Sequence, residues 1–406
     1  MGALELASAK PSLALLILGA VCAAGLTFAL SLVVVRLCRR WGLLGRAEAG
    51  RAAPPSVPRL GGLAIFASFL VVSALFVRPA NPYELHVYAG FLVAAVLIIG
   101  VTAIDDVRGL SPWLRLAVQT LAALIAMFPL AHGTLIEVIH NPLASSGQGQ
   151  IFLPLWIAIP FTWFWIVGMM NTINWVDGAD GLAGGVVAIT ALVMAAISWM
   201  LGQHTAAFLC AALAGATLGF LPLNWHPARL FMGDCGAMFL GLALAMLANV
   251  GGAKLAMMML LLGIPILDMG RVIMYRLRRG RSPLRHDSSH LHQRLAKLGL
   301  SQRQIALLYY SLTAAFGLVT IIAANLQRHA SGWSLRTRLL PQIEIAATEL
   351  PTLLGLALVV GVSIVIWRVV AYRRRRRGLP PGASSAGKMP TPPRLSPSAS
   401  GARRRP

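Results

Sequence analysis

The chain has 406 residues, of which 57% are hydrophobic and 12% are charged, against about 45–50% and 25% in an average soluble domain. Lysine and arginine (35) outnumber acidic residues (13), which gives a net charge of +22, yet the mean hydropathy is +0.73. These values exclude a soluble enzyme and indicate a protein that crosses a membrane many times. They also argue against nucleic-acid binding, because the arginines cluster where apolar segments end.

About eleven apolar runs approach the length of roughly 20 residues that a helix needs to span a bilayer. We therefore expect an all-α polytopic membrane protein with about eleven transmembrane helices. Residues 1–372 would form the transmembrane domain, and residues 373–406 a basic, Pro/Ser/Gly-rich, disordered cytoplasmic tail. The runs are residues 12–35, 60–77, 87–104, 114–131, 153–170, 182–201, 206–223, 237–250, 255–275, 305–324 and 350–367.

The distribution of basic residues sets the expected orientation, because loops rich in lysine and arginine stay in the cytoplasm. Alternate loops carry most of the arginines, and the tail adds the run Arg373 to Arg377. We therefore expect the N-terminus outside and the C-terminus in the cytoplasm. The other basic residues expected in the cytoplasm are Arg36, Arg39, Arg40, Arg46, Arg51, Arg59, Arg108, Arg229, Arg276, Arg278, Arg279, Arg281, Arg285, Arg294, Lys297 and Arg303.

The acidic residues are sorted by side in this topology. All seven aspartates fall on the cytoplasmic side, whereas Glu48 is the one glutamate of six that does. Carboxylates beside a membrane are costly to desolvate, so a cluster drawn from several loops indicates a cation or proton site. Solvated loop acids are the alternative, which does not explain the sorting. The aspartates are Asp105, Asp106, Asp177, Asp180, Asp234, Asp268 and Asp287.

The first two polar motifs follow the runs 87–104 and 153–170. Asp105 and Asp106 are adjacent carboxylates that repel each other, which makes one of them a candidate proton acceptor, although a simple helix end is the alternative. The segment NTINWVDGADGLAG places four oxygen-bearing side chains in what we expect to be one short loop. Such a set suits a hard cation or a nucleotide, with a capped helix start as the alternative. The four are Asn171, Asn174, Asp177 and Asp180.

The third motif, NWHPARLFMGDCG, precedes the run 237–250. Asp234 could hold Mg²⁺ there, and Phe231 could stack on a planar base. Farther along the chain, GIPILDMGR places Asp268 inside a span. Both an ion pair with Arg271 and a catalytic role are possible interpretations there.

The fourth motif, HDSSHLHQRL, lies in the longest basic loop. Its two histidines and two arginines could bind the oxygens of a diphosphate. A zinc site is the weaker alternative, because two histidines two residues apart lack the usual companion ligands. The four residues are Arg285, His290, His292 and Arg294.

Together these motifs resemble the polyprenyl-phosphate N-acetylhexosamine-1-phosphate transferases (glycosyltransferase family 4), of the undecaprenyl-phosphate GlcNAc-1-phosphate transferase type. The resemblance covers roughly residues 59–300. It rests on PRLGG, the paired aspartates with LSP, NxxNxxDGxDGLAG, NWxPAxxFMGDxG, PILD and HLHxRL.

The resemblance implies a bundle of ten or eleven spans in a bacterial inner membrane, with the active site facing the cytoplasm. It implies transfer of a sugar-1-phosphate from a UDP-N-acetyl sugar to undecaprenyl phosphate with release of UMP, as the initiating step of a cell-envelope glycan. The implied cofactor is Mg²⁺, with Mn²⁺ as an alternative. Membrane lipids are expected partners, no nucleic acid is expected, and a homodimer is left open.

The resemblance also implies roles for matching positions. Asn174 and Asp234 correspond to Mg²⁺ ligands, and Asp105 to the base or orienting carboxylate for the lipid phosphate, with Asp106 beside it. The remaining matching positions are expected to bind the substrate: Asp180 and Phe231 the uracil, His290 and His292 the sugar diphosphate, and with them Asn171, Asp177, Arg285 and Arg294.

Two departures from the family pattern bear on acceptor binding and on the donor. Gly50, Arg51 and Ala53 stand where an Arg-Lys pair and a histidine are usual, and Arg115 replaces a lysine. The short HLH run disfavours a muramoyl-pentapeptide donor. UDP-GlcNAc is the expected donor, followed by other UDP-N-acetyl sugars such as the QuiNAc or FucNAc forms.

Two functions of other classes remain as alternatives. A secondary transporter or lipid flippase would require charges at mid-membrane and an inverted repeat. The sequence shows no such repeat, and Asp268 is the one acid well inside a span. A membrane anchor without catalysis would leave the sorted aspartates unexplained.

Overall fold

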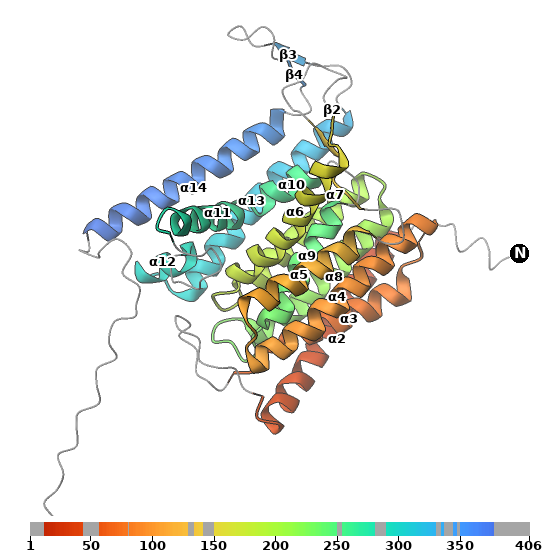
Figure 1. The fold of residues 1–406 in the computed structure, drawn as a ribbon, viewed down its shortest axis with the longest axis vertical. Helices are drawn as coiled ribbons and strands as arrows, with labels where there is room; N and C mark the ends of the chain where they lie inside the picture. The colour runs from red at the N-terminus through yellow and green to blue at the C-terminus, as the bar shows by residue number, and fades with distance from the viewer. Residues whose placement is uncertain are drawn as a thin grey trace, which may run out of the picture.

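The computed structural model describes residues 12–43, 57–79, 81–128, 134–140, 150–249, 254–280, 290–329, 334–336, 344–346 and 350–376. Helices occupy all of the apolar runs that the sequence predicts (Figure 1). In chain order the helices are α2 (Leu13–Arg40), α3 (Gly61–Phe76), α4 (Pro82–Arg108), α5 (Pro112–Met127), α6 (Leu155–Val176), α7 (Leu182–Met200), α8 (His204–Asn224), α9 (Gly233–Asn249), α10 (Lys254–Leu261), α11 (Gly263–Leu277), α12 (Leu291–Lys297), α13 (Gln302–His329) and α14 (Leu350–Arg376).

Short strands form two antiparallel pairs beside the helices. β1 (Val138–His140) pairs with β2 (Gln150–Phe152), and β3 (Ser334–Arg336) pairs with β4 (Glu344–Ala346). β3 and β4 lie beyond one end of α13 and α14, whereas α12 lies at the other end of these two helices (Figure 1).

The all-α polytopic class is confirmed, whereas the number of spans is only partly tested. Within the described residues, six helices are long and apolar enough to cross a membrane, or seven if the bent pair α10 and α11 counts as one span. Helices α3, α5 and α9 and residues 357–372 of α14 are apolar but shorter. Eleven spans and the orientation of the termini therefore stay predictions.

The ninth apolar run is not the single helix that the sequence analysis expects. It is divided into α10 and α11, whose axes differ by 80°. Pro265 has no backbone N–H to continue the hydrogen-bond ladder, and its ring clashes with the carbonyl one turn earlier. Gly263 lies at the break, where an added Cβ would be 2.3 Å from Val359 Cγ1 of α14. The bend therefore has both a local cause and a packing cause.

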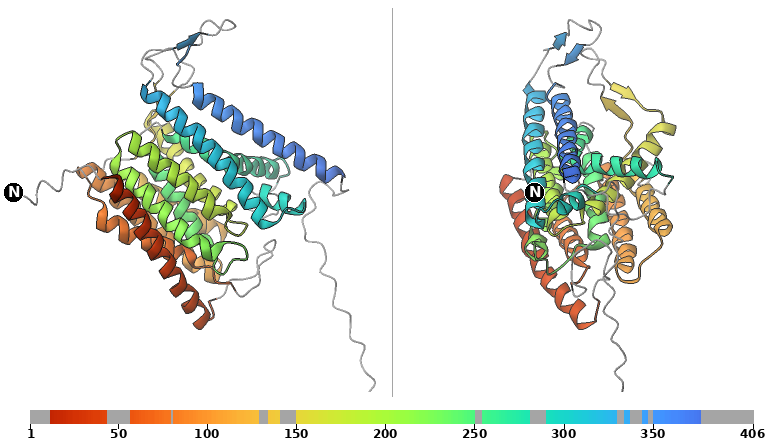
Figure 2. Two further views of the ribbon diagram at one scale, coloured as in Figure 1. Left: turned by 180° about the vertical axis from the view of Figure 1, so that it is seen from behind. Right: turned by 90° about the vertical axis from the view of Figure 1, so that its left-hand side faces the viewer.

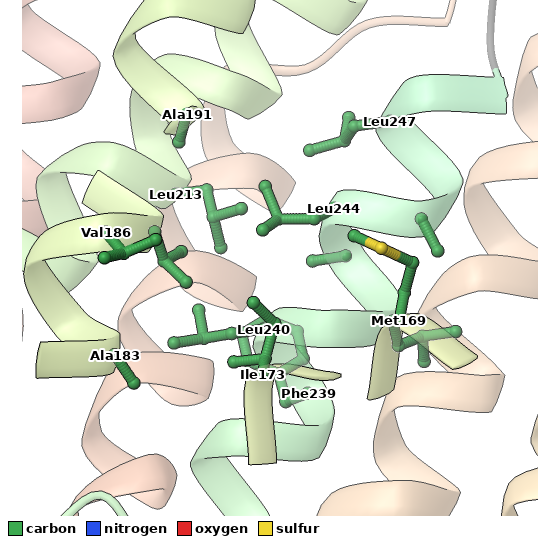
Figure 3. Close-up of a cluster of buried hydrophobic side chains, with 14 of the residues drawn as sticks. Met169, Ile173, Ala183, Val186, Ala191, Leu213, Phe239, Leu240, Leu244 and Leu247 are labelled. Atoms are coloured by element: carbon green, nitrogen blue, oxygen red, sulfur yellow. The ribbon is translucent and has the colours of Figure 1, made fainter. Parts of the chain in front are cut away.

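The hydrophobic core extends through most of the helical bundle, and one part of it lies between α6, α7, α8 and α9. Side chains from all four helices meet there, among them Ile173, Val186, Leu213 and Leu240 (Figure 3). No charged side chain is among these core residues, although buried hydroxyl groups occur within the same helices, as at Thr190 and Thr217.

Small residues allow α2 to approach α8 closely. A Cβ added at Gly215 or Gly219 would lie 2.0 Å from the carbonyl oxygen of Ala20 or 2.1 Å from that of Ala24. Such close backbone approach is typical of helices that associate inside membranes. Helices α11, α13 and α14 lie on the other side of the bundle from α2 (Figure 2).

The PRLGG segment brings the start of α3 against the start of α9. Phe231 N–H donates to the carbonyl of Pro58 (2.8 Å), and the N–H groups of Gly61 and Gly62 donate to the carbonyls of Phe231 (3.0 Å) and Met232 (2.9 Å). A Cβ at Gly62 would lie 2.1 Å from the backbone nitrogen of Gly236. This contact fixes where α9 begins, and with it the position of Asp234.

Candidate active site

A polar cluster forms where α4 ends and α9 begins, with Arg115 of α5 at its centre. The guanidinium of Arg115 contacts Asp105 through Nη2 (3.1 Å to Oδ1) and Asp234 through Nη1 (3.0 Å to Oδ2). The carboxylate of Asp105 is inaccessible to solvent, whereas 23% of the Asp234 side chain is exposed. Arg115 therefore bridges two carboxylates from different helices, of which Asp234 is the accessible one.

Asp106 caps the N-terminus of α9. Its Oδ1 accepts the N–H of Asp234 (2.8 Å), and its Oδ2 accepts the N–H of Cys235 (3.0 Å). A carboxylate at this place satisfies helix N–H groups that have no partner within the helix and interacts favourably with the helix dipole. The two neighbouring aspartates thus have different surroundings. Asp105 contacts Arg115, and Asp106 binds the backbone N–H groups of Asp234 and Cys235. Their predicted catalytic roles stay predictions.

Asn174 completes the cluster from the last turn of α6. Its Nδ2 donates to Asp234 Oδ1 at 2.8 Å, so the carbonyl oxygen of its amide is the atom available to a cation. Among the described residues, no group of three or more histidine, cysteine, aspartate or glutamate side chains is arranged to hold a metal ion. One carboxylate and one amide oxygen fit Mg²⁺ bound jointly with substrate phosphates, because Mg²⁺ keeps several waters and takes few protein ligands.

Asn171 and Asn174 are not in a loop, contrary to the sequence analysis. Helix α6 continues to Val176, because an apolar face persists through Met170 and Ile173 up to its end. Asn171 lies about one turn before Asn174, and its Nδ2 donates to Gln119 Oε1 (2.9 Å). Asn171 therefore contacts α5.

Asp177 and Asp180 follow α6, and Asp180 belongs to a second group of contacts. Asp177 is buried at the C-terminal end of the helix. Asp180 Oδ2 lies 2.7 Å from His226 Nδ1 and accepts the N–H of Ala228 (3.2 Å). Asp180 thus connects the turn after α6 to the segment between α8 and α9.

Phe231 is buried, with 4% of its surface exposed. Its backbone pairs with the PRLGG segment at the start of α9. The ring would have to become accessible to stack on a base, so its predicted contact with uracil stays a prediction.

His290 and His292 lie beside the C-terminal end of α6. Their rings are nearly parallel (9°) with centroids 5.9 Å apart, and His290 lies 5.1 Å from the ring of Trp175. A Cβ at Gly178 would be 2.1 Å from His292 Nε2. The structure therefore brings both histidines to the NTINWVDGADG motif, as expected for one site. Arg294 follows in α12, and Arg285 lies outside the described residues.

Asp268 forms the ion pair with Arg271 that the sequence analysis left open (Nη2 to Oδ1, 3.1 Å). Its other carboxylate oxygen lies 3.3 Å from His290 Nδ1. Asp268 therefore has a second partner besides Arg271.

Sequence reasoning missed the bridging position of Arg115 and the contact of Trp175 with His290. Arg115 was noted as a replacement for a lysine, but no local spacing shows that α5 carries it between Asp105 and Asp234. Trp175 is adjacent to Asn174 in sequence, and that adjacency was the available signal.

A separate apolar cavity of about 360 Å³ lies at the other end of α4, lined among others by Tyr83, Glu84, Phe91, His204 and Leu209. Phe91 is the lining residue of α4 nearest to Asp106 in sequence, and it lies 15 residues before it, or about 22 Å of helix at 1.5 Å per residue. The cavity is therefore separate from the polar cluster.

Comparisons with known proteins agree with the motifs. Residues 88–252 match glycosyl transferase family 4. The decaprenyl-phosphate N-acetylglucosaminephosphotransferase of Mycobacterium tuberculosis (strain ATCC 25618 / H37Rv) is 35% identical over 301 residues, which cover 66% of this chain and 73% of that protein. The probable undecaprenyl-phosphate N-acetylglucosaminyl 1-phosphate transferase of Bacillus subtilis (strain 168) is 31% identical over 296 residues, 71% of this chain and 80% of that protein.

A phospho-N-acetylmuramoyl-pentapeptide-transferase of Levilactobacillus brevis is also similar, at 31% identity, but over 197 residues that cover 46% of this chain and 59% of that protein. One end of the helical bundle carries the paired aspartates, Asn174 of α6, Asp234 of α9 and the HLH segment. The chain belongs to glycosyl transferase family 4, among the polyprenyl-phosphate sugar-1-phosphate transferases.

Proposed function

We propose that this protein transfers N-acetylglucosamine-1-phosphate from UDP-GlcNAc to a polyprenyl phosphate, undecaprenyl phosphate in the first instance, and releases UMP. The product, a lipid-linked sugar diphosphate, would start a cell-envelope glycan at the cytoplasmic face of the inner membrane. The observation that carries the proposal is the contact network of Asp105, Arg115, Asp234 and Asn174 from four helices.

The reaction exchanges one phosphoanhydride for another. An oxygen of the lipid phosphate forms a bond to the β-phosphorus of the UDP-sugar, and the bond from that phosphorus to the bridging oxygen breaks. The electron pair leaves with UMP. Such phosphoryl transfer requires mainly in-line placement and charge neutralisation, which Arg115 and a cation held by Asp234 and Asn174 would supply.

Asp234 and Asn174 are the residues that would hold Mg²⁺ or Mn²⁺. When bound, the ion would neutralise charge on the diphosphate. Asp106 keeps the backbone of Asp234 in place through the N-terminus of α9, and Asp105 keeps Arg115 beside Asp234. In this proposal both aspartates act by positioning, and Asp105 orients Arg115 toward the acceptor phosphate.

Arg115 is the proposed contact for the lipid phosphate. Its guanidinium already lies between two carboxylates, at the edge where Asp234 is partly exposed. A guanidinium presents several donors in one plane and binds phosphate oxygens in pairs. An arginine at this position therefore suits a phosphate that must be held in line.

The donor is proposed as UDP-GlcNAc because the relatives with the longer matches are named for N-acetylglucosamine. Other UDP-N-acetyl sugars are the second choice. The transporter alternative has less support, because the carboxylates of the polar cluster lie at helix ends. Asp268, which lies inside α11, is paired with Arg271.

The test is turnover by the purified full chain in detergent or nanodiscs, with Mg²⁺, undecaprenyl phosphate and a panel of UDP-sugars. We expect UDP-GlcNAc to be consumed with release of UMP, and excess UMP to regenerate UDP-GlcNAc from the lipid product. Release of UDP would contradict the proposed chemistry. Consumption of another UDP-sugar alone would change the donor and leave the reaction type intact.

A further inference from the structure

Asp268 has two groups of partners, on different segments of the chain. Its Oδ1 accepts from Arg271 Nε (3.3 Å) and Nη2 (3.1 Å), one turn along α11. Its Oδ2 accepts the N–H of Leu291 (2.9 Å) and lies 3.3 Å from His290 Nδ1. The residue is 5% exposed. An ion pair with Arg271 alone would not require the second oxygen to face a segment 22 residues farther along the chain.

His290 also contacts α6, through Trp175. Its ring centroid lies 5.1 Å from that of Trp175, with an angle of 57° between the two planes. Trp175 is also contacted by the guanidinium of Arg276, which lies 5.2 Å from the ring centroid. Trp175 directly follows Asn174, the proposed metal ligand, so the HLH segment and α11 together hold the last turn of α6.

His292 supports the turn that comes next. Its ring packs so closely on Gly178 that an added Cβ there would overlap the imidazole, at 2.1 Å from Nε2. His292 and His290 are stacked, so movement of His290 would be transmitted to both sides of the end of α6. Asp268 contacts His290 through the ring nitrogen Nδ1.

We propose that Asp268 is a positioning residue of the transferase site: through His290 and Trp175 it sets the position of Asn174 and of the turn that follows α6. The inference rests on the proposed function of this site. By donating from Nδ1 to the carboxylate, His290 would be fixed in one tautomer and one ring orientation, as outer-shell carboxylates do for histidines in other active sites. The part that Asp268 plays is thereby distinct from its ion pair with Arg271.

The test compares Asp268→Asn with Arg271→Gln in the full chain. Asp268→Asn weakens the contact with His290, whereas Arg271→Gln removes the ion pair and leaves Asp268 facing His290. We expect Asp268→Asn to raise both the KM for UDP-GlcNAc and the Mg²⁺ concentration for half-maximal rate by roughly 10-fold, the lower end of the cost of losing an outer-shell partner. Arg271→Gln should change these two quantities less than 2-fold, that is by less than about 0.4 kcal/mol.

A second measurement is independent of turnover. In protein labelled with ¹⁵N-histidine, the His290 signals, identified by their loss in His290→Gln, should show a protonated Nδ1 in the unsubstituted protein and should shift in Asp268→Asn. They should stay in place in Arg271→Gln.

Three outcomes overturn the inference. The first is an unchanged His290 signal in Asp268→Asn. The second is a Mg²⁺ requirement and a KM that stay constant in Asp268→Asn. The third is an equal effect of Arg271→Gln on the KM, which would show a structural ion pair only. If the unsubstituted protein consumes no UDP-sugar but the His290 signal shifts as expected, the proposed function fails while the coupling of Asp268 to His290 stands.

Discussion

Arg115 contacts the carboxylates of two helices that are distant in sequence, Asp105 at the end of α4 and Asp234 at the start of α9. Without a cation between them, the two negative charges and that of Asp106 would repel one another in surroundings that are partly closed to water. At the scale of single residues, this arginine therefore both holds the cluster together and offers a positive charge to an incoming phosphate.

Substituting Arg115 should separate charge from geometry. We expect Arg115→Gln to lower the rate by roughly 10- to 100-fold, which corresponds to a charged hydrogen bond of about 1.5–3 kcal/mol. Arg115→Lys should lose less, because it keeps the charge but not the paired donors. Both substitutions should raise the KM for the lipid phosphate more than they raise the KM for the UDP-sugar. The reverse pattern would place Arg115 in the donor site.

Asp234→Asn should remove the charged ligand proposed for Mg²⁺. We expect a loss on the order of a thousandfold in kcat/KM, from several kcal/mol of lost transition-state stabilisation, while the protein still inserts in the membrane. Asn174→Ala should act in the same direction. The matched control is Glu84→Gln, which neutralises a carboxylate at the other end of α4 and should leave the rate unchanged. Full activity of Asp234→Asn across a Mg²⁺ titration would remove Asp234 from the site.

At the scale of elements, the starting points of α3 and α9 depend on glycine. Gly62 and Gly236 bring the two helices into backbone contact, next to the segment that carries Asp234. A side chain here would force the helices apart, because closely packed interiors do not absorb an added methyl group without strain.

Gly62→Ala tests this contact. We expect it to destabilise the protein by about 1–3 kcal/mol through overpacking and to lower activity by shifting Asp234. Gly100→Ala in α4 is the control, because nothing lies within 4 Å of its added Cβ and alanine is favoured over glycine in a helix by about 1 kcal/mol. Thermal unfolding in detergent measures both. Equal midpoints for the two variants would contradict the role given to the close contact.

The apolar runs predicted where the helices lie, because a stretch that must bury its backbone in lipid has no alternative to a helix. The run with Gly263 and Pro265 was predicted as one span, although proline already signalled the break between α10 and α11. Polar side chains at spacings of three predict a loop at Asn171 and Asn174, but the buried apolar residues between them continue the helix. In the structure those side chains are on the last turns of α6.

The candidate site could be predicted in part. Motif spacing singled out Asp106, Asn174 and Asp234, which the structure brings together. The contact of Asp268 with His290 was not predictable, because it depends on how the bend between α10 and α11 directs α11 toward α12. Contacts between segments remote in sequence require the tertiary arrangement of the helices.

At the scale of the whole molecule, the described aspartates meet at one end of the bundle, while Glu84 lies at the other end of α4. This agrees with the sorting of acids seen in the sequence. From the basic-residue rule we expect the aspartate end to face the cytoplasm.

Reporter fusions test that assignment. We expect a reporter after Arg377 to read as cytoplasmic and one inserted near Glu84 to read as external, because alternate loops differ in basic content. A reporter inserted beside Asp177 should agree with the one after Arg377. If the Glu84 and Asp177 positions read on the same side, the two ends of α4 would not lie across the membrane from each other, and the topology would be wrong.

The proposed reaction is defined by which bond of the donor breaks. UDP-GlcNAc labelled separately on its α- and β-phosphorus, supplied with Mg²⁺ and undecaprenyl phosphate to the purified protein, measures this directly. The account predicts that the β-phosphorus appears in the lipid product and the α-phosphorus in UMP. Recovery of both labels together in UDP would show cleavage of the sugar–phosphate bond and would contradict it.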